Sequence, residues 1–246
     1  LKSPPPSRSQ PSTPTNPTQP PLFKPTKGLS ANQDTLYLNG NIEKGLCQSF
    51  KSIIINQTKK LVIVNSGGGN VPESECIARE MIKNKMDIEV KGFCFSSCAN
   101  FLFLAGVSKT IKQGGCVAYH GSTDALVKEQ GNGGARKLVI NSILKGLTDE
   151  EKSQAKSAVN WEEAVNSNIE EILQTVKTET AFFKDVGVDT ELFEMSNKDD
   201  KGAGDGKIRH LLILGPNGFE KFKIKNVFGN NPTKLEDYET YYYNQK

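Results

Sequence analysis

The order of apolar and polar positions in the first half of the chain predicts strands that alternate with helices. Short apolar runs of strand length occur at residues 35–38, 61–64, 87–92 and 116–120. Between the first three runs, apolar residues recur at helical spacing, first over 44–55 and again from Pro72, which suits the first turn of a helix. Such alternation predicts an α/β domain with a mainly parallel sheet and flanking helices.

The second half is dominated by a long helical pattern. A polar connection with several glycines over 121–134 leads into amphipathic spacing from 135 to about 183, broken near 146–148. We expect this segment to form a helical arm or insertion. Beyond it the sequence predicts shorter elements: a short helix in 186–193, a polar loop over 196–206, a strand over 208–214, a short helix over 218–223 and a final segment over 224–228.

The two ends differ in composition from this central part. Residues 1–33 hold most of the prolines among Ser, Thr, Gln and Asn, which predicts an extended tether, and the chain starts at Leu1, leaving room for a leader or anchor before it. No acid precedes Asp34, so the tether has a charge of +4. Since the whole chain has a net charge of +3, the remainder has a charge of about −1. We therefore expect one domain over 34–230, a C-terminal tail over 231–246, and no nucleic-acid groove.

Five cysteines allow two interpretations. They lie at Cys47, Cys76, Cys94, Cys98 and Cys116. The Cys94–Cys98 spacing has no second Cys/His pair nearby, so we expect no metal site. The cysteines are either small buried residues or, in an exported protein, they form one or two disulfides that leave one thiol free.

The candidate catalytic residues lie at or just after the ends of three predicted strands. A glycine loop over 67–69 follows one strand, Ser96 and Ser97 stand where the next strand meets an apolar helix, and His120 ends a third strand. In parallel sheets these carboxyl ends gather at one edge. A serine needs a base such as neutral imidazole to become a nucleophile, and glycine N–H groups can stabilise an oxyanion. The alternative is an N-cap pair of serines and a structural histidine.

Four motifs in this region, at 65–69, 92–100, 103–106 and 117–121, together resemble the Clp-type serine peptidases of the crotonase-like fold. The similarity is greatest to exported bacterial relatives in which cysteines flank the nucleophile, and it covers roughly residues 35–230. It implies Ser96 as nucleophile, favoured over Ser97 because it is central in Cys-x-Ser-x-Cys, and His120 as base. The implied oxyanion donors are Gly68 and the N–H of Ser97, with Gly69 able to share the task.

The same resemblance implies an acid late in the chain that orients the histidine. Alignment back from Pro216 places His210 at this position, which is not an acid. We take Asp205 as the candidate acid. Its alternatives are Asp199 and Asp200 in the same loop and Glu179 in the helical arm.

The strand-end residues predict a serine hydrolase, and the resemblance to exported bacterial relatives implies that it is exported, and periplasmic or envelope-associated in a bacterium. The resemblance implies that it is a peptidase acting on peptides or proteins without a cofactor, and that it forms a homo-oligomer, since Clp-type relatives form rings. The proline-rich segment would tether it to the envelope. Two alternatives stay open: a catalytically degenerate scaffold or assembly protein that keeps the fold, and, more weakly, a crotonase-type enzyme acting on acyl-CoA.

Overall fold

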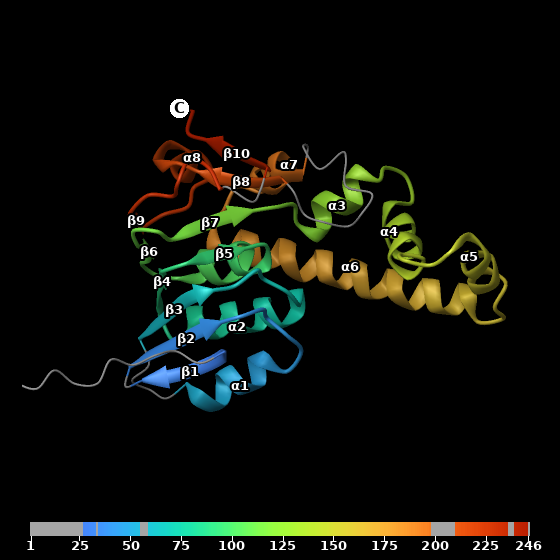
Figure 1. The fold of residues 1–246 in the computed structure, drawn as a ribbon, viewed down its shortest axis with the longest axis horizontal. Helices are drawn as coiled ribbons and strands as arrows, with labels where there is room; N and C mark the ends of the chain where they lie inside the picture. The colour runs from blue at the N-terminus through green and yellow to red at the C-terminus, as the bar shows by residue number, and fades with distance from the viewer. Residues whose placement is uncertain (1–26, 33, 55–58, 198–209, 236–238, 246) are drawn as a thin grey trace, which may run out of the picture.

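The chain folds into a mixed α/β structure in which two mostly parallel sheets are flanked by helices, which confirms the predicted α/β class (Figure 1). The computed structural model describes residues 27–32, 34–54, 59–197, 210–235 and 239–245. Most of the predicted tether (residues 1–26), most of the predicted polar loop (residues 198–206) and the first residues of the strand predicted over 208–214 lie outside this described part.

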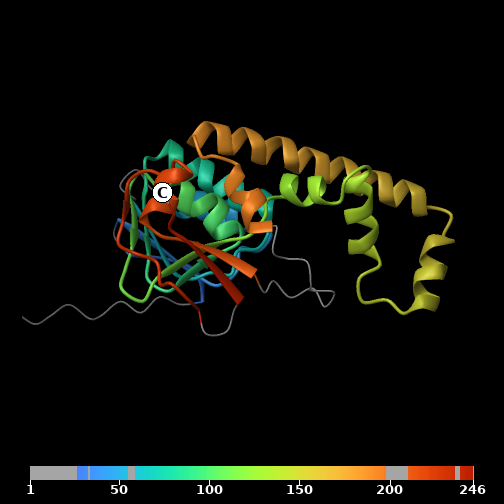
Figure 2. The ribbon, with the colours of Figure 1, turned by 90° about the horizontal axis from the view of Figure 1, so that it is seen from above.

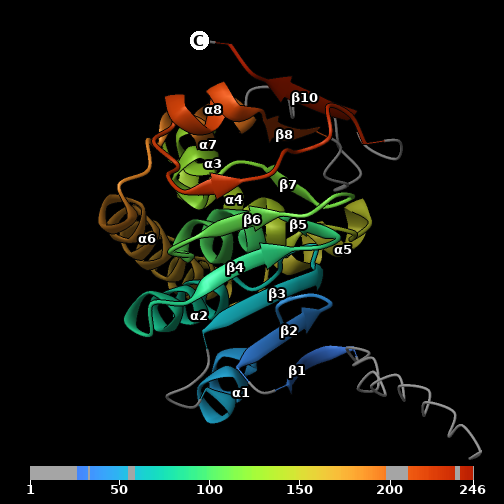
Figure 3. The same ribbon diagram turned by 90° about the vertical axis from the view of Figure 1, so that its left-hand side faces the viewer.

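The larger sheet has six strands in the order β1-β2-β3-β4-β6-β9, and Figure 3 shows this succession. Only β1 and β2 pair antiparallel within it; the other neighbours are parallel. Its strands are β1 (Gly28–Asn32), β2 (Thr35–Asn39), β3 (Lys60–Asn65), β4 (Asp87–Val90), β6 (Lys109–Ile111) and β9 (Val227–Phe228).

The smaller sheet has four strands in the order β10-β8-β7-β5. They are β5 (Phe93–Phe95), β7 (Cys116–Tyr119), β8 (His210–Leu214) and β10 (Glu239–Tyr243). β7 pairs parallel with β5 and antiparallel with β8, and all four of its residues are buried. A strand covered on both faces reads as a continuous apolar run, as 116–119 does in the sequence.

Three helical segments pack among the first strands. They are α1 (Leu46–Ile53), α2 (Val71–Lys83) and η1, a stretch of π-helix (Cys98–Phe103). α2 begins as predicted, with Pro72 in its first turn, and the Asn70 side chain caps it by accepting the Glu73 N–H at 3.0 Å. Every residue of η1 is buried, so this helix lies in the core.

The predicted arm is made of α4 (Gly134–Ile143), α5 (Asp149–Lys156) and α6 (Trp161–Val186). The C-terminal part of α6 lies along the body and contacts α2, while its other end projects beyond the body with α4 and α5 (Figures 1 and 2). α5 buries none of its residues. The break expected near 146–148 is where Thr148 caps α5 in a capping box with Glu151.

The structure corrects several predicted connections and ends. The connection over 121–134 contains a helix, α3 (Thr123–Glu129), which Ser122 caps by accepting the Ala125 N–H at 3.2 Å. Residues 28–32, which composition assigned to the tether, form β1, and part of the predicted tail forms β10. β1 gains order by pairing with the adjacent strand β2, and β10 by pairing with β8, and composition alone does not reveal either pairing. The remaining helices are α7 (Glu191–Asn197) and α8 (Pro216–Lys221).

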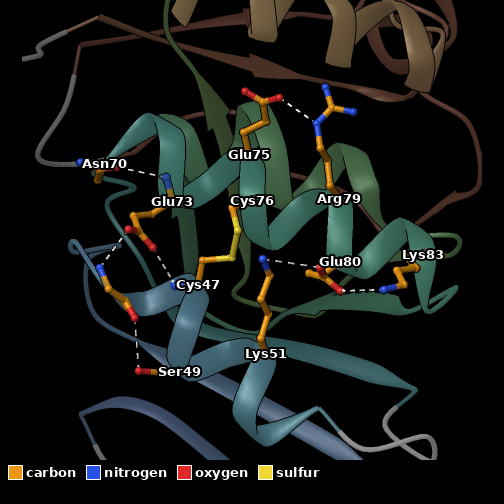
Figure 4. The surroundings of a disulfide bond; sticks show 11 residues. Cys47, Ser49, Lys51, Asn70, Glu73, Glu75, Cys76, Arg79, Glu80 and Lys83 are labelled. Carbon is orange, nitrogen blue, oxygen red and sulfur yellow. Dashed lines mark hydrogen bonds and ion pairs between the residues drawn. A yellow bond between two sulfur atoms is a disulfide. The ribbon is translucent and has the colours of Figure 1, made fainter. Parts of the chain in front are cut away.

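The cysteine pairing is also defined by the structure. Cys47–Cys76 joins α1 to α2, and Figure 4 shows the two helices side by side at this bond. Near it, the Glu73 carboxylate accepts the N–H groups of Gly45 and Cys47 at the start of α1, at 2.9 and 2.7 Å. Cys94–Cys98 spans the corner after β5, and Cys116 is a buried free thiol. Among the residues described, no helix is both long and apolar enough to span a bilayer.

Candidate functional site

The corner between β5 and η1 holds Ser96 in an unusual backbone conformation. Its φ is 57°, in the left-handed region that residues other than glycine rarely adopt. The corner is held from both sides: the Ser96 N–H donates to Ala118 O at 3.3 Å, and Ser96 O accepts the Asn100 N–H at 2.8 Å. The Cys94–Cys98 disulfide brackets the same residues. Strained backbone that is so constrained is a common property of functional sites.

The Ser96 hydroxyl meets the imidazole of His120. Ser96 Oγ and His120 Nε2 form a hydrogen bond. The contact follows from the sheet register. Phe95 pairs with Ala118, and because β5 and β7 are parallel, the residues that follow the two strands continue side by side. Both residues are half-buried, so the pair is reachable from solvent.

The glycine loop lies directly against this corner. Ser66, directly after β3, forms an isolated bridge with Cys94, which brings residues 67–69 beside Ser96. Gly68 has a φ of +84°, and a Cβ there would lie 2.7 Å from Phe95 O and 2.8 Å from Ser97 N. Only glycine fits this position without displacing the corner.

The second serine of the corner fastens the loop in place. Ser97 Oγ accepts the Gly69 N–H at 2.7 Å and donates to Gly69 O at 3.2 Å, and the residue is 3% exposed. Its own N–H lies in the first turn of the helical segment, where backbone N–H groups have no intrahelical acceptor. The structure thus gives the two serines different surroundings, which the sequence could not distinguish.

Of the candidate acids, only Glu179 lies within the described residues. Asp199, Asp200 and Asp205 lie outside the described residues, and His210 begins β8 with a side chain that is likewise not described. Glu179 lies on α6 at 1% exposure, and its Oε2 accepts the Thr123 N–H at 2.9 Å, at the start of α3. Burial raises the pKa of Glu179 to about 7, although hydrogen bonds from Thr123 and Asp124 oppose this.

One polar residue beside the pair was missed by the sequence analysis. Asn100 lies on η1 at 3% exposure, and its Nδ2 donates to His120 O at 3.3 Å. The available signal was a single amide within the apolar run 98–104. Its role required knowing that η1 passes behind the end of β7.

No group of three or more His, Cys, Asp or Glu side chains in the described part of the chain is arranged to hold a metal ion. Comparison of the sequence with protein-family models and with curated proteins gave no match.

Proposed function

We propose that the chain is a serine hydrolase that resembles the Clp-type peptidases of the crotonase-like fold and cleaves peptides or proteins. The observation that carries this proposal is the hydrogen bond between Ser96 Oγ and His120 Nε2 at a strained, disulfide-bracketed corner. A serine hydroxyl is a weak nucleophile by itself, and an imidazole within hydrogen-bond reach is what activates it.

In the proposed reaction, Ser96 Oγ attacks the substrate carbonyl carbon while its proton passes to His120 Nε2. The tetrahedral intermediate collapses to an acyl-serine as the imidazolium returns this proton to the leaving amine. Water then attacks the acyl-serine while one of its protons passes to His120. The second tetrahedral intermediate collapses to the free acid as the imidazolium returns the proton to Ser96 Oγ. No cofactor takes part in these steps.

The proposed oxyanion donors are the N–H groups of Ser97 and Gly68. They belong to adjacent backbone segments, since a Cβ on Gly68 would lie 2.8 Å from Ser97 N. The Gly68 N–H donates to Ser66 Oγ at a long distance of 3.3 Å, and a charged oxygen would displace this bond. The Gly69 N–H is already bonded to Ser97 Oγ, so we leave it out of the donor set. Loss of one such donor typically costs about 100-fold or more in rate.

For the orienting acid we retain Asp205, with Asp199 and Asp200 as alternatives. Glu179 is bonded to the Thr123 N–H at the start of α3, and we assign it a structural role. His210 carries no carboxylate and is not proposed.

The fold supports the proposed resemblance in one respect. The chain alternates between the two sheets: β4 and β6 lie in the larger sheet, and the strands that follow them, β5 and β7, lie in the smaller one. The two disulfides favour an oxidising compartment, which fits the proposed exported, envelope-associated location.

A fluorophosphonate probe, which reacts with activated serines, tests the proposal. We expect labelling of the wild-type chain and none of Ser96→Ala or His120→Ala. Ser49→Ala, on the exposed face of α1, is the matched control and should label fully. Labelling of Ser96→Ala at the wild-type rate would refute the proposed nucleophile.

The projecting arm favours a second candidate function, that of a non-catalytic scaffold. α5 buries nothing, and Val159 and Leu173 are exposed on or beside α6, as in a segment that contacts other chains. If this candidate is correct, His120→Ala will preserve the biological role that deletion of 134–160 removes. The crotonase-type acyl-CoA alternative gains less support, because that class does not need a Ser–His pair.

A further inference from the structure

Asn100 is bonded to both members of the Ser96–His120 pair. Its backbone N–H donates to Ser96 O at 2.8 Å, and its side-chain Nδ2 donates to His120 O at 3.3 Å. His120 lies one residue beyond the end of β7, where the strand ladder has stopped. The amide therefore holds the main chain at a point where the sheet no longer does.

Packing does not explain why this residue is polar. Every other residue of η1 (Cys98–Phe103) is apolar, and Asn100 is 3% exposed. Its Oδ1 is buried and accepts no hydrogen bond from any residue that the structure describes. A buried amide that is only partly satisfied costs free energy, because the unpaired oxygen has lost its hydrogen bonds to water. An apolar side chain of similar size would suit this helix better.

We propose that Asn100 is a positioning residue for the reaction assigned above, and this inference rests on the proposed function. Through the His120 carbonyl, its amide keeps the imidazole Nε2 at the Ser96 hydroxyl. The fold tolerates the unpaired Oδ1 because the Nδ2 is needed at this place. Residues that trade stability for function in this way are expected at active sites.

Two substitutions separate positioning from packing. Asn100→Leu has a similar shape and loses the hydrogen bond, so its unfolding midpoint should equal or exceed that of the wild type. Its rate constant with the fluorophosphonate probe should fall about 10- to 100-fold, since a misplacement of about 1 Å can cost about 100-fold. Asn100→Asp turns an oxygen toward the His120 carbonyl, which also slows the reaction. Its carboxylate favours the imidazolium, so the apparent pKa of the rate–pH profile should rise.

Asn231→Leu is the matched control. Asn231 is also buried and holds the other end of β7, bonding Val117 N and O at 2.7 and 3.0 Å and Leu214 O at 3.1 Å. Its loss should lower the unfolding midpoint while the rate constant per folded molecule and the pH profile stay those of the wild type.

The positioning role is overturned if both Asn100 variants react at the wild-type rate while Ser96→Ala does not react. It is also overturned if their losses only follow the folded fraction, as those of Asn231→Leu should. If Asn100→Leu does not fold, Asn100→Asp supplies the same comparison. Labelling that persists in Ser96→Ala would instead refute the proposed function, and the positioning role with it.

Discussion

Glu179 links the arm to the segment that follows His120, and its charge makes this link pH-dependent. The carboxyl group is 1% exposed on α6 and accepts the Thr123 N–H at 2.9 Å. Burial raises its pKa from an ordinary value of 4.5 to about 7, and the nearby charge of Glu75 acts in the same direction. The N–H groups of Thr123 and Asp124 and the Thr123 side chain act against it.

The sign of the effect on stability follows from proton binding. Between pH 4.5 and about pH 7, the folded chain keeps a proton on Glu179 that the unfolded chain has released. The contribution of this proton to the stability of the folded chain is therefore fully present below pH 4.5 and is lost as the pH rises through about 7. A pKa difference of this size corresponds to roughly 3 kcal/mol of unfolding free energy.

Urea unfolding of the wild type and Glu179→Gln between pH 4.5 and 8 measures this effect. Glutamine is neutral at every pH, so the variant should gain roughly 3 kcal/mol relative to the wild type across this range. Glu171→Gln changes an exposed carboxylate of the same helix and is the matched control. If the difference between Glu179→Gln and the wild type is constant within about 0.5 kcal/mol over the range, the reasoning is wrong.

Two further predictions concern the geometry of the corner. Gly68→Ala should destabilise the fold by about 1–3 kcal/mol or more and abolish probe labelling, because its Cβ would meet Phe95 O at 2.7 Å. Gly114→Ala has a similar φ of +83° with nothing within 4 Å, so in the same labelling assay and thermal melt it should lose only modest stability and no reactivity. Removing Cys94–Cys98 by double alanine substitution should cost about 2 kcal/mol and slow labelling, whereas removing Cys47–Cys76, which closes a longer loop, should cost about 3.5 kcal/mol with labelling unchanged. Equal labelling after either removal would show that the first disulfide does not support the corner.

The sequence predicted those parts of the fold that depend on local pattern. The strands at 61–64 and 116–120 and the helix from Pro72 are found close to their expected positions. The strand predicted over 87–92, however, ends earlier, at Val90, as β4, and a second strand, β5, begins at Phe93. The chain passes from one sheet to the other near Gly92, where a Cβ would lie 2.1 Å from Val64 O. No local pattern shows that two adjacent apolar runs belong to different sheets.

The site was predictable in outline but not in detail. The positions of Ser96 and His120 at strand ends could be inferred, because parallel strands bring their carboxyl ends together. The separate surroundings of Ser96 and Ser97 could not, since they depend on a positive φ and on a hydrogen bond to Gly69, 28 positions away. The role of Asn100 was hidden for the same reason, because its partner His120 lies on another element. Glu179 was named as an alternative acid, but its hydrogen bond to the Thr123 N–H could not be predicted.

The late pairing of β10 with β8 has a consequence for biosynthesis. Strands β1 to β4 are neighbours in the larger sheet in the same order as in the chain, and the last of them ends at Val90. This part of the sheet can therefore assemble while the arm is still being synthesised. The sheet beneath Ser96 and His120 must wait for His210–Leu214 and Glu239–Tyr243, because non-local pairing comes only after long loops close. In a nascent chain, part of the core would thus fold well before the sheet that supports Ser96 is complete. The sheet that supports the proposed nucleophile would be complete only after residue 243 has been added.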